Sequence, residues 1–209
     1  MCLLCSGDPV EGDKRQANEL SFKVSMMEAP KADPMCCLAS CFCPCCAQIY
    51  IRRKALHYDM TKYSCCQGYM DGLVPCVNSG SCGESSCPNA CLCLESFLCN
   101  GCAVSSTRML VMDRHNLRPD EWDNRIIVGR EQLSCPSQLR CNNCIQLASV
   151  ICDCLALCVP AARDAADSMR CIAQCTYAST QGCMTAQINV ELEHRDAFVP
   201  MQNEVMERV

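Results

Sequence analysis

The sequence predicts a mainly α-helical fold, in which a cysteine-rich helical domain is interrupted by long irregular, turn-rich segments. Cysteine accounts for 26 of the 209 residues, a density otherwise typical of small secreted disulfide scaffolds. A chain of this length can nevertheless bury an ordinary core without covalent staples. Many cysteines and apolar residues recur at spacings of three and four, which places them on one face of a helix. The two observations together favour helices whose inner faces carry thiols.

The beginning of the chain bears on what the thiols do. The first twenty residues contain no basic start followed by an apolar run, so we expect no secretory signal and a cytoplasmic, reducing location. In such a compartment dense cysteine patterns indicate metal more often than disulfides. Zinc takes four such ligands in a tetrahedron, so we predict that zinc sites stabilise the helical domain. Disulfides and cysteines that act as small buried hydrophobes remain the alternatives.

Composition divides the chain into three parts. Residues 1–33 are polar and are predicted to form an N-terminal arm that is either loose or ordered on contact. Residues 34–183 hold most of the cysteines and form the predicted metal-stabilised domain, and residues 184–209 are predicted to be a C-terminal tail. No fixed-period repeat is evident.

The first cysteine-rich stretch carries no charge from Pro34 to Ile51. Pro44 interrupts it, since proline breaks a helix interior. We therefore expect a cysteine-rich turn followed by a helix from about Cys45 to Tyr58. The uncharged run just reaches the length of a membrane-spanning helix, but the proline and the thiols argue against that interpretation.

Glycine and proline punctuate residues 64–90, which are predicted to be turns that need metal to hold them. Further helices are predicted over residues 91–117, 135–160 and 161–195. Cys99 and Cys102 form a CxxC pair inside the first of these, and Cys141 and Cys144 form another in the second. Gly182 interrupts the last helix at a cost of about 1 kcal/mol.

A CxxC pair or an i,i+4 pair on a helix supplies two zinc ligands with a suitable separation. On this basis we expect about two to four zinc ions, although the sequence leaves open which cysteines share one. Three histidines, His57, His115 and His194, are possible fourth ligands. The candidate ligands are Cys37, Cys41, Cys43, Cys45, Cys65, Cys66, Cys87, Cys91, Cys99, Cys102, Cys141, Cys144, Cys154, Cys158, Cys171 and Cys175.

Other classes of function find little support. The net charge is −5 and the longest basic run is only Arg52–Lys54, so we expect no nucleic-acid partner. No phosphate-binding loop, paired-carboxylate signature or nucleophile elbow is present. A thioredoxin-like CxxC follows a strand, whereas Cys99–Cys102 lies in a predicted helix. We expect a protein that is not an enzyme.

The segment CLASCFCPC at residues 37–45 resembles the CLxxxxCPC motif of the placenta-specific cysteine-rich family, which includes plant cell-number regulators and cadmium-resistance proteins. The match covers Cys37, Leu38, Cys43, Pro44 and Cys45, and residues 91–113 resemble the family's second cysteine-rich block. The resemblance implies association with membranes and with metal tolerance. The chain departs from the plant pattern in its cysteine-rich residues 135–183 and lacks two clean apolar spans.

Taken together, these patterns predict a non-catalytic, zinc-binding structural or scaffold protein that interacts with other protein subunits of a larger assembly. Its metal-binding free energy would then be folding free energy. The alternative is a membrane-associated, metal-handling protein of the cadmium-resistance type. A thiol redox protein or a metal buffer is a third hypothesis, although the many apolar residues argue against a buffer.

Overall fold

The computed structural model describes residues 13–71, 79–80, 83–122 and 141–196 of the chain. Within these residues the fold is mainly α-helical, as predicted, and strand pairing is limited to one isolated bridge between Leu20 and Leu117. The helices follow the order η1 (Lys14–Ala17), α1 (Ala29–Ala32), α2 (Pro34–Phe42), α3 (Pro44–Ala55), η2 (Met60–Lys62), η3 (Cys65–Gly68), α4 (Pro88–Leu98), α5 (Asn100–His115), α7 (Cys141–Cys158), η5 (Pro160–Ala162) and α8 (Arg163–Asp196).

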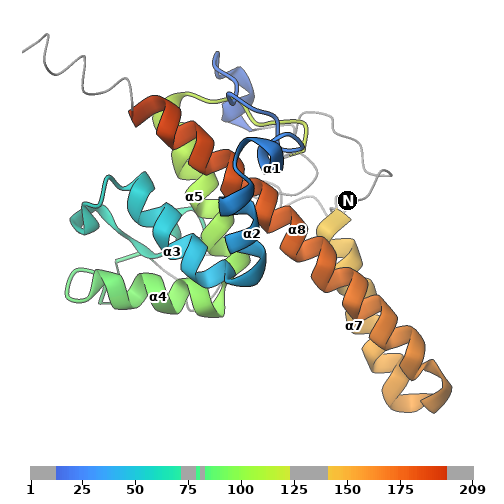
Figure 1. Cartoon of the computed structure of the whole chain (residues 1–209). Helices are drawn as coiled ribbons and strands as arrows, with labels where there is room; N and C mark the ends of the chain where they lie inside the picture. The colour runs from blue at the N-terminus through green and yellow to red at the C-terminus, as the bar shows by residue number, and fades with distance from the viewer. Residues whose placement is uncertain (1–12, 72–78, 81–82, 123–140, 197–209) are drawn as a thin grey trace, which may run out of the picture.

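The long helix α8 organises the molecule (Figure 1). Its C-terminal half packs against α1, α2, α3 and α5, while its N-terminal half pairs with α7 in a helical hairpin that projects from the body. Arg170 and Asp153 join the two helices of this hairpin at 2.7 Å. Residues 184–196, which the sequence assigned to a C-terminal tail, instead continue α8 without a break. Met184, Ile188 and Leu192 in that segment are buried, because they face α3 and α5.

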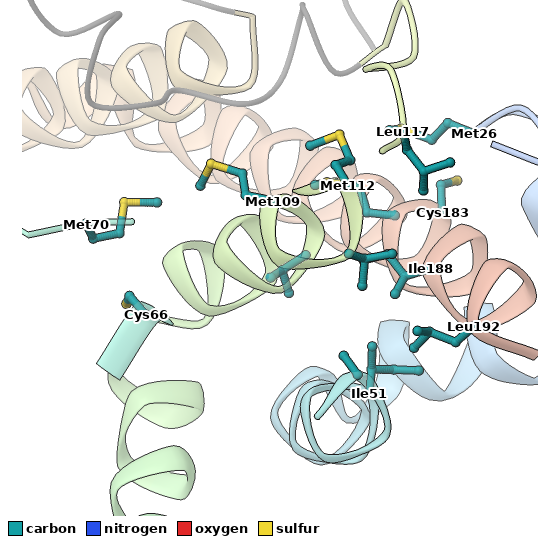
Figure 2. Close-up of a cluster of buried hydrophobic side chains, with 14 residues drawn as sticks. Met26, Ile51, Cys66, Met70, Met109, Met112, Leu117, Cys183, Ile188 and Leu192 are labelled. Carbon is teal, nitrogen blue, oxygen red and sulfur yellow. The ribbon is translucent and has the colours of Figure 1, made fainter. Parts of the chain in front are cut away.

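The core lies between α3, α5 and α8, as Figure 2 shows for Ile51, Met112 and Ile188. Methionine fills much of it, and its flexible thioether suits the irregular gaps between helices that cross at different angles. Phe22, from the N-terminal part of the described chain, packs against this cluster. The ring of Phe22 lies 4.4 Å from the buried guanidinium of Arg108. Phe22 and Met26 thus bring the segment before α1 into contact with the core. Residues 1–12 and 197–209 lie outside the described chain.

The prediction of a turn before Pro44 is wrong, because residues 34–42 form α2. Asp33 caps this helix by accepting a hydrogen bond of 3.0 Å from the Cys36 backbone, and Pro34 occupies the first helical position, where it is favoured. Pro44 likewise starts α3, which runs to Ala55 and so confirms the helix expected after it. The cap at Asp33 and a proline at the first helical position therefore start helices in a segment for which we predicted a turn.

The helix predicted over residues 91–117 is divided in two at Cys99. Its backbone leaves the helical region there, with φ −133° and ψ 49°, so that α4 ends at Leu98 and α5 begins at Asn100. Cys43 breaks α2 from α3 in nearly the same conformation, with φ −135° and ψ 70°. At both breaks, therefore, a single cysteine with a non-helical backbone separates two consecutive helices.

These two helix pairs form a short internal repeat, contrary to the sequence-based expectation of none. The breaks at Cys43 and Cys99 are 56 residues apart (99 minus 43). The helices α2 and α3 form the first unit and α4 and α5 the second. At this offset the identical pairs are Cys37/Cys93, Leu38/Leu94, Ser40/Ser96, Cys43/Cys99, Cys46/Cys102, Ala47/Ala103 and Arg52/Arg108. Both serines and both arginines are buried, so the repeat is a feature of packing as well as of sequence.

Candidate metal centre

Two adjacent thiols lie on the strained turn η3. Cys66 and Gln67 both have a positive φ, 45° and 50°, in the left-handed region that side chains other than glycine rarely adopt. Such a conformation costs on the order of 1–3 kcal/mol per residue and persists only when its surroundings hold it. The backbone N–H of Cys65 donates to Glu84 at 2.6 Å, and that of Cys66 donates to Glu95 at 2.9 Å. The two carboxylates therefore fix the turn that carries both thiols.

Glu95, on α4, is only 6% exposed and accepts two further hydrogen bonds. One oxygen, Oε1, accepts from Arg52 at 3.0 Å, and the other, Oε2, accepts from the hydroxyl of Tyr63 at 2.8 Å as well as from Cys66. A carboxylate oxygen has two lone-pair sites. Oε2 has both of its sites engaged, whereas Oε1 retains one. The carboxylate is thus held in one orientation with acceptor capacity left on a single oxygen.

The ligand atoms of Cys65, Cys66 and Glu95 all lie within 4.8 Å of one another, the only such group of potential metal ligands in the part of the chain that the structure describes. Cys66 also interacts electrostatically with Cys102, and Cys102 interacts with Cys99 and Glu95. The strained turn and the start of α5 therefore bring four of the predicted ligands into one neighbourhood, around a carboxylate that the sequence had not assigned to metal.

Burial keeps these thiols protonated when no metal is bound. It is the largest cause that raises the pKa of Cys66 far above its ordinary value, and the neighbouring charge of Glu95 adds to it. Burial also raises the pKa of Cys102, with Cys99 and Glu95 as further causes. Because only a thiolate is a strong ligand, a cation that enters this centre must displace protons.

Arg52 supplies a compensating positive charge. Its side chain is fully buried, pairs with Glu95, and donates to Ser106 at 2.5 Å and to the carbonyl of Ala103 at 2.9 Å. Its Nε and Nη1 groups have no hydrogen-bond partner among the described residues. The positive charge of Arg52 therefore lies next to the thiols with only part of its donor capacity used.

A second group of thiols joins α2 to α8. Cys37 interacts with both Cys41 and Cys183, and burial is the main cause that raises the pKa of Cys37 to about 11. Gly182 lets the helices approach, since a Cβ atom there would lie 2.9 Å from Sγ of Cys41 and 3.1 Å from the carbonyl oxygen of Cys37. These thiols are packed into a helix–helix contact, and the arrangement includes no carboxylate.

The other predicted ligands are dispersed. Cys43, Cys46 and Cys93 are exposed, whereas Cys45 is half-buried; Cys43, Cys45 and Cys93 all interact with Cys46. Cys87 lies just before α4 and is exposed. Cys91, on α4, packs against a second hydrophobic cluster formed by Leu56, Tyr63 and Leu92. The remaining candidates belong to the α7–α8 hairpin, where Cys154, Cys171 and Cys175 are exposed and the side chains of Cys141, Cys144 and Cys158 lie outside the described part.

Glu95 is the main residue that sequence reasoning missed, although a signal for it was present. It is the single charged residue between Ser85 and Thr107, and a lone charge in an apolar helix is either exposed or paired. Its partner Arg52 lay in a basic run that looked like the solvated end of a helix. The pairing of these two residues depends on the packing of α3 on α4, which spacing along the chain does not reveal.

Comparison of the chain with models of protein families, with curated proteins and with solved structures found no match. Among the described helices, none combines the length and the apolar composition needed to cross a bilayer. The chain is cysteine-rich, and its described part holds a group of side chains suited to a metal ion.

Proposed function

We propose that the protein is a non-catalytic, zinc-binding structural protein whose principal metal centre is formed by Cys65, Cys66, Glu95 and Cys102. The observation that carries this proposal is the clustering of two thiols and one carboxylate within 4.8 Å on a strained turn. Strain of this kind needs stabilisation from its surroundings, and the binding free energy of a metal supplies it because structural metal binding is coupled to folding.

The charge of the centre favours a divalent cation. Without metal, Glu95 and Arg52 compensate each other and the buried thiols are neutral. A zinc ion with the Cys65, Cys66 and Cys102 thiolates and the Glu95 carboxylate would carry two excess negative charges. Arg52, which pairs with Glu95, would offset one of them. Burial of an uncompensated charge is costly, so the buried arginine favours a centre of this composition.

Cys102 is the fourth ligand in this proposal, because it lies in the electrostatic neighbourhood of Cys66 and Glu95. Its sulfur is not part of the group whose ligand atoms lie within 4.8 Å of one another, so it would move toward the other three ligands when the metal binds. A thiolate there completes the tetrahedral set that structural zinc sites show. Thiolate-rich sites select zinc and copper(I) over magnesium and calcium, which prefer oxygen ligands. With all four positions taken by protein, the metal has no open position for substrate, in keeping with a structural role.

Exposed apolar side chains support a role in a larger assembly. In the two repeat units, Phe42 and Leu98 occupy equivalent positions before the breaks and are 86% and 67% exposed. Leu38 and Leu94, four residues earlier in each unit, are also exposed. The same apolar pair is thus presented twice, on helices α2 and α4 that carry no exposed charge. Other protein subunits are the partners that we propose for these faces.

Elemental analysis of the full-length protein purified under reducing conditions tests the proposal. We expect at least one zinc per chain, and one equivalent less in Cys66→Ser. Cys171→Ser is the matched control, because Cys171 is exposed on the projecting hairpin, and it should retain the wild-type zinc content. Less than one metal per chain, with every thiol titratable in the folded state, would contradict the proposal.

The same apolar faces also favour a second candidate, a membrane-associated protein that handles metal as cargo. The resemblance of residues 37–45 to the placenta-specific cysteine-rich family supports this candidate. Flotation with neutral lipid vesicles distinguishes the two. Binding that is lost in Phe42→Ser and Leu98→Ser, together with zinc that exchanges within minutes, would favour the membrane candidate. Failure to float, with slow metal exchange, favours the structural protein.

A further inference from the structure

The repeat places the same CxxC pair at the start of both second helices. In the first unit Cys43 is the N-cap of α3 and Cys46 is the third helical residue, and in the second unit Cys99 and Cys102 hold the same positions on α5. The two thiols of each pair also interact with each other electrostatically, Cys43 with Cys46 and Cys99 with Cys102. The sequence-based objection that a CxxC pair lies inside a helix therefore does not hold, because both pairs lie at helix starts.

The two pairs differ in their surroundings. Cys99 and Cys102 are partly buried, and burial is the largest cause that raises the pKa of Cys102. Cys43 and Cys46 are both exposed. The interaction with Cys46 lowers the pKa of Cys43, and the interaction with Cys43 raises the pKa of Cys46. The described residues provide no carboxylate close enough to complete a metal-ligand group with this pair.

We propose that Cys43 and Cys46 form a surface dithiol that undergoes reversible thiol–disulfide exchange with a low-molecular-weight disulfide. The inference does not depend on the metal centre. Cys43 is the attacking thiol, since it is exposed at the positive end of the α3 dipole, which favours a thiolate. Cys46 is the resolving thiol, since a CxxC pair at a helix start brings the two sulfur atoms within reach of one bond.

The exchange balances in two steps. The Cys43 thiolate attacks one sulfur of the small disulfide, so that a mixed disulfide forms and one small thiolate leaves. Cys46 then loses its proton to that thiolate and attacks the sulfur of Cys43, which releases the second small thiolate to take up the proton that Cys43 had lost to solvent. The protein gives up two electrons and two protons, and the small disulfide becomes two thiols.

The hairpin contains a pair that serves as a matched control. Cys171 and Cys175 are also exposed and interact with each other, and Cys171 raises the pKa of Cys175. They lie four residues apart inside the continuous helix α8. Side chains at that spacing have Cβ atoms about 5–6 Å apart, whereas a disulfide needs about 3.5–4.5 Å. Exposure and proximity are thus shared by the two pairs, while the geometry for a disulfide is not.

The test uses the full-length protein purified under reducing conditions and freed of reductant, then incubated with oxidised glutathione and mapped by differential alkylation and peptide mass spectrometry. We expect a Cys43–Cys46 disulfide, with at least about a tenfold loss of alkylation at both residues and reversal by reduced glutathione. Cys171 and Cys175 should stay alkylatable. In Cys46→Ser, one glutathione should remain on Cys43, whereas Cys43→Ser should give neither the disulfide nor a rapid adduct at Cys46.

Three results would overturn the proposal. The first is a glutathione adduct on Cys43 that persists in the wild type as it does in Cys46→Ser, because Cys46 would then not resolve it. The second is a disulfide that maps to the neighbouring thiols Cys45 or Cys93. The third is a zinc content that falls by one equivalent in Cys43→Ser, with zinc protecting Cys43 from alkylation, since the pair would then be a metal site. Because both thiols are exposed, circular dichroism should show the variants folded.

Discussion

Replacement of Gly182 by alanine should destabilise the protein, although helix propensity alone predicts the opposite. Alanine is favoured over glycine in a helix interior by about 1 kcal/mol. The added Cβ atom, however, would lie 2.9 Å from Sγ of Cys41, and 3.1 Å from both the carbonyl oxygen and Sγ of Cys37. Ordinary van der Waals separations are about 3.5–4.0 Å. Because one of these neighbours is backbone, α2 itself would have to move.

The steric effect should exceed the gain in helix propensity. Overpacking of a close contact costs typically about 1–3 kcal/mol, so the unfolding free energy of Gly182→Ala should fall by up to about 2 kcal/mol once the helix gain of about 1 kcal/mol is subtracted. For a chain of this length each kcal/mol corresponds to a shift in Tm of about 2–4 °C. Urea denaturation followed by circular dichroism measures the free-energy change directly, provided that the slope with denaturant is unchanged.

Gly101→Ala is the matched control for Gly182→Ala. Gly101 lies in the first turn of α5, and the nearest atom to an added Cβ would be the hydroxyl oxygen of Tyr177 at 3.4 Å, an ordinary contact. This variant should be as stable as the wild type or more stable by up to about 1 kcal/mol. Removal of a neighbouring thiol in the double variant Gly182→Ala, Cys41→Ala should recover part of the loss. A Gly182→Ala protein more stable than the wild type would refute the close approach of α2 to α8.

Three further predictions concern the thiols and the buried ion pair. Cys102→Ser should lower zinc content by one equivalent, and unchanged stoichiometry by elemental analysis would remove Cys102 from the ligand set. Glu95→Gln should lower the free energy of unfolding by about 3 kcal/mol, because it leaves a buried arginine without its counter-charge. The exposed control Glu193→Gln should lower it by less than about 1 kcal/mol. Equal losses of unfolding free energy for the two variants on urea denaturation would contradict a buried pair. The Tm of the metal-free, reduced protein should fall as pH rises from 9 toward 11. Burial raises the pKa of Cys36 to about 12 and that of Cys37 to about 11, from an ordinary value of 9.0. These thiols therefore stay protonated in the folded state while those of the unfolded chain ionise, which favours unfolding. A flat profile there would show that the thiols are not buried.

The sequence predicts those parts of the fold that local chemistry determines. The spacing of apolar residues locates α3, α7 and α8, and Pro44 begins α3 next to the predicted start at Cys45. Pro34 and Pro88 also occupy the first position of a helix, a signal that the sequence-based prediction did not use. The break at Cys99 was missed because its neighbours Asn100 and Gly101 only weakly disfavour a helix, and the decisive backbone turn is recognisable only beside its counterpart at Cys43. The extent of α8, Arg163–Asp196, agrees with the helix predicted over residues 161–195. Only the assignment of residues 184–196 to a tail was wrong, since the last cysteine, Cys183, is a boundary of composition and not of packing.

The candidate metal centre was only half predictable. The adjacent thiols Cys65 and Cys66 and the CxxC pair that ends at Cys102 stand out in the sequence. Their proximity depends instead on two left-handed residues in η3 and on the carboxylates of Glu84 and Glu95, which bind the turn from other segments. Contacts between residues far apart in the chain produce no regular spacing in the sequence, so the grouping of ligands could not be derived from the spacing of cysteines.

The two repeat units explain why one centre, and not two, is suited to metal in this way. Each unit buries an arginine at the same position, Arg52 in the first and Arg108 in the second. Arg52 meets Glu95 of the second unit, but the position equivalent to Glu95 in the first unit is Ala39, so Arg108 receives no carboxylate from that position.

Arg108 is accommodated by residues outside the repeat. It donates to the amide oxygen of Gln187 at 2.6 Å and lies over the ring of Phe22, while the amide nitrogen of Gln187 donates to Asp120 at 3.2 Å. The two units thus share the Cys43/Cys99 and Cys46/Cys102 positions and a buried arginine, but only the second unit carries a buried carboxylate, Glu95, that pairs with an arginine. The thiols of the first pair are exposed and those of the second pair are partly buried.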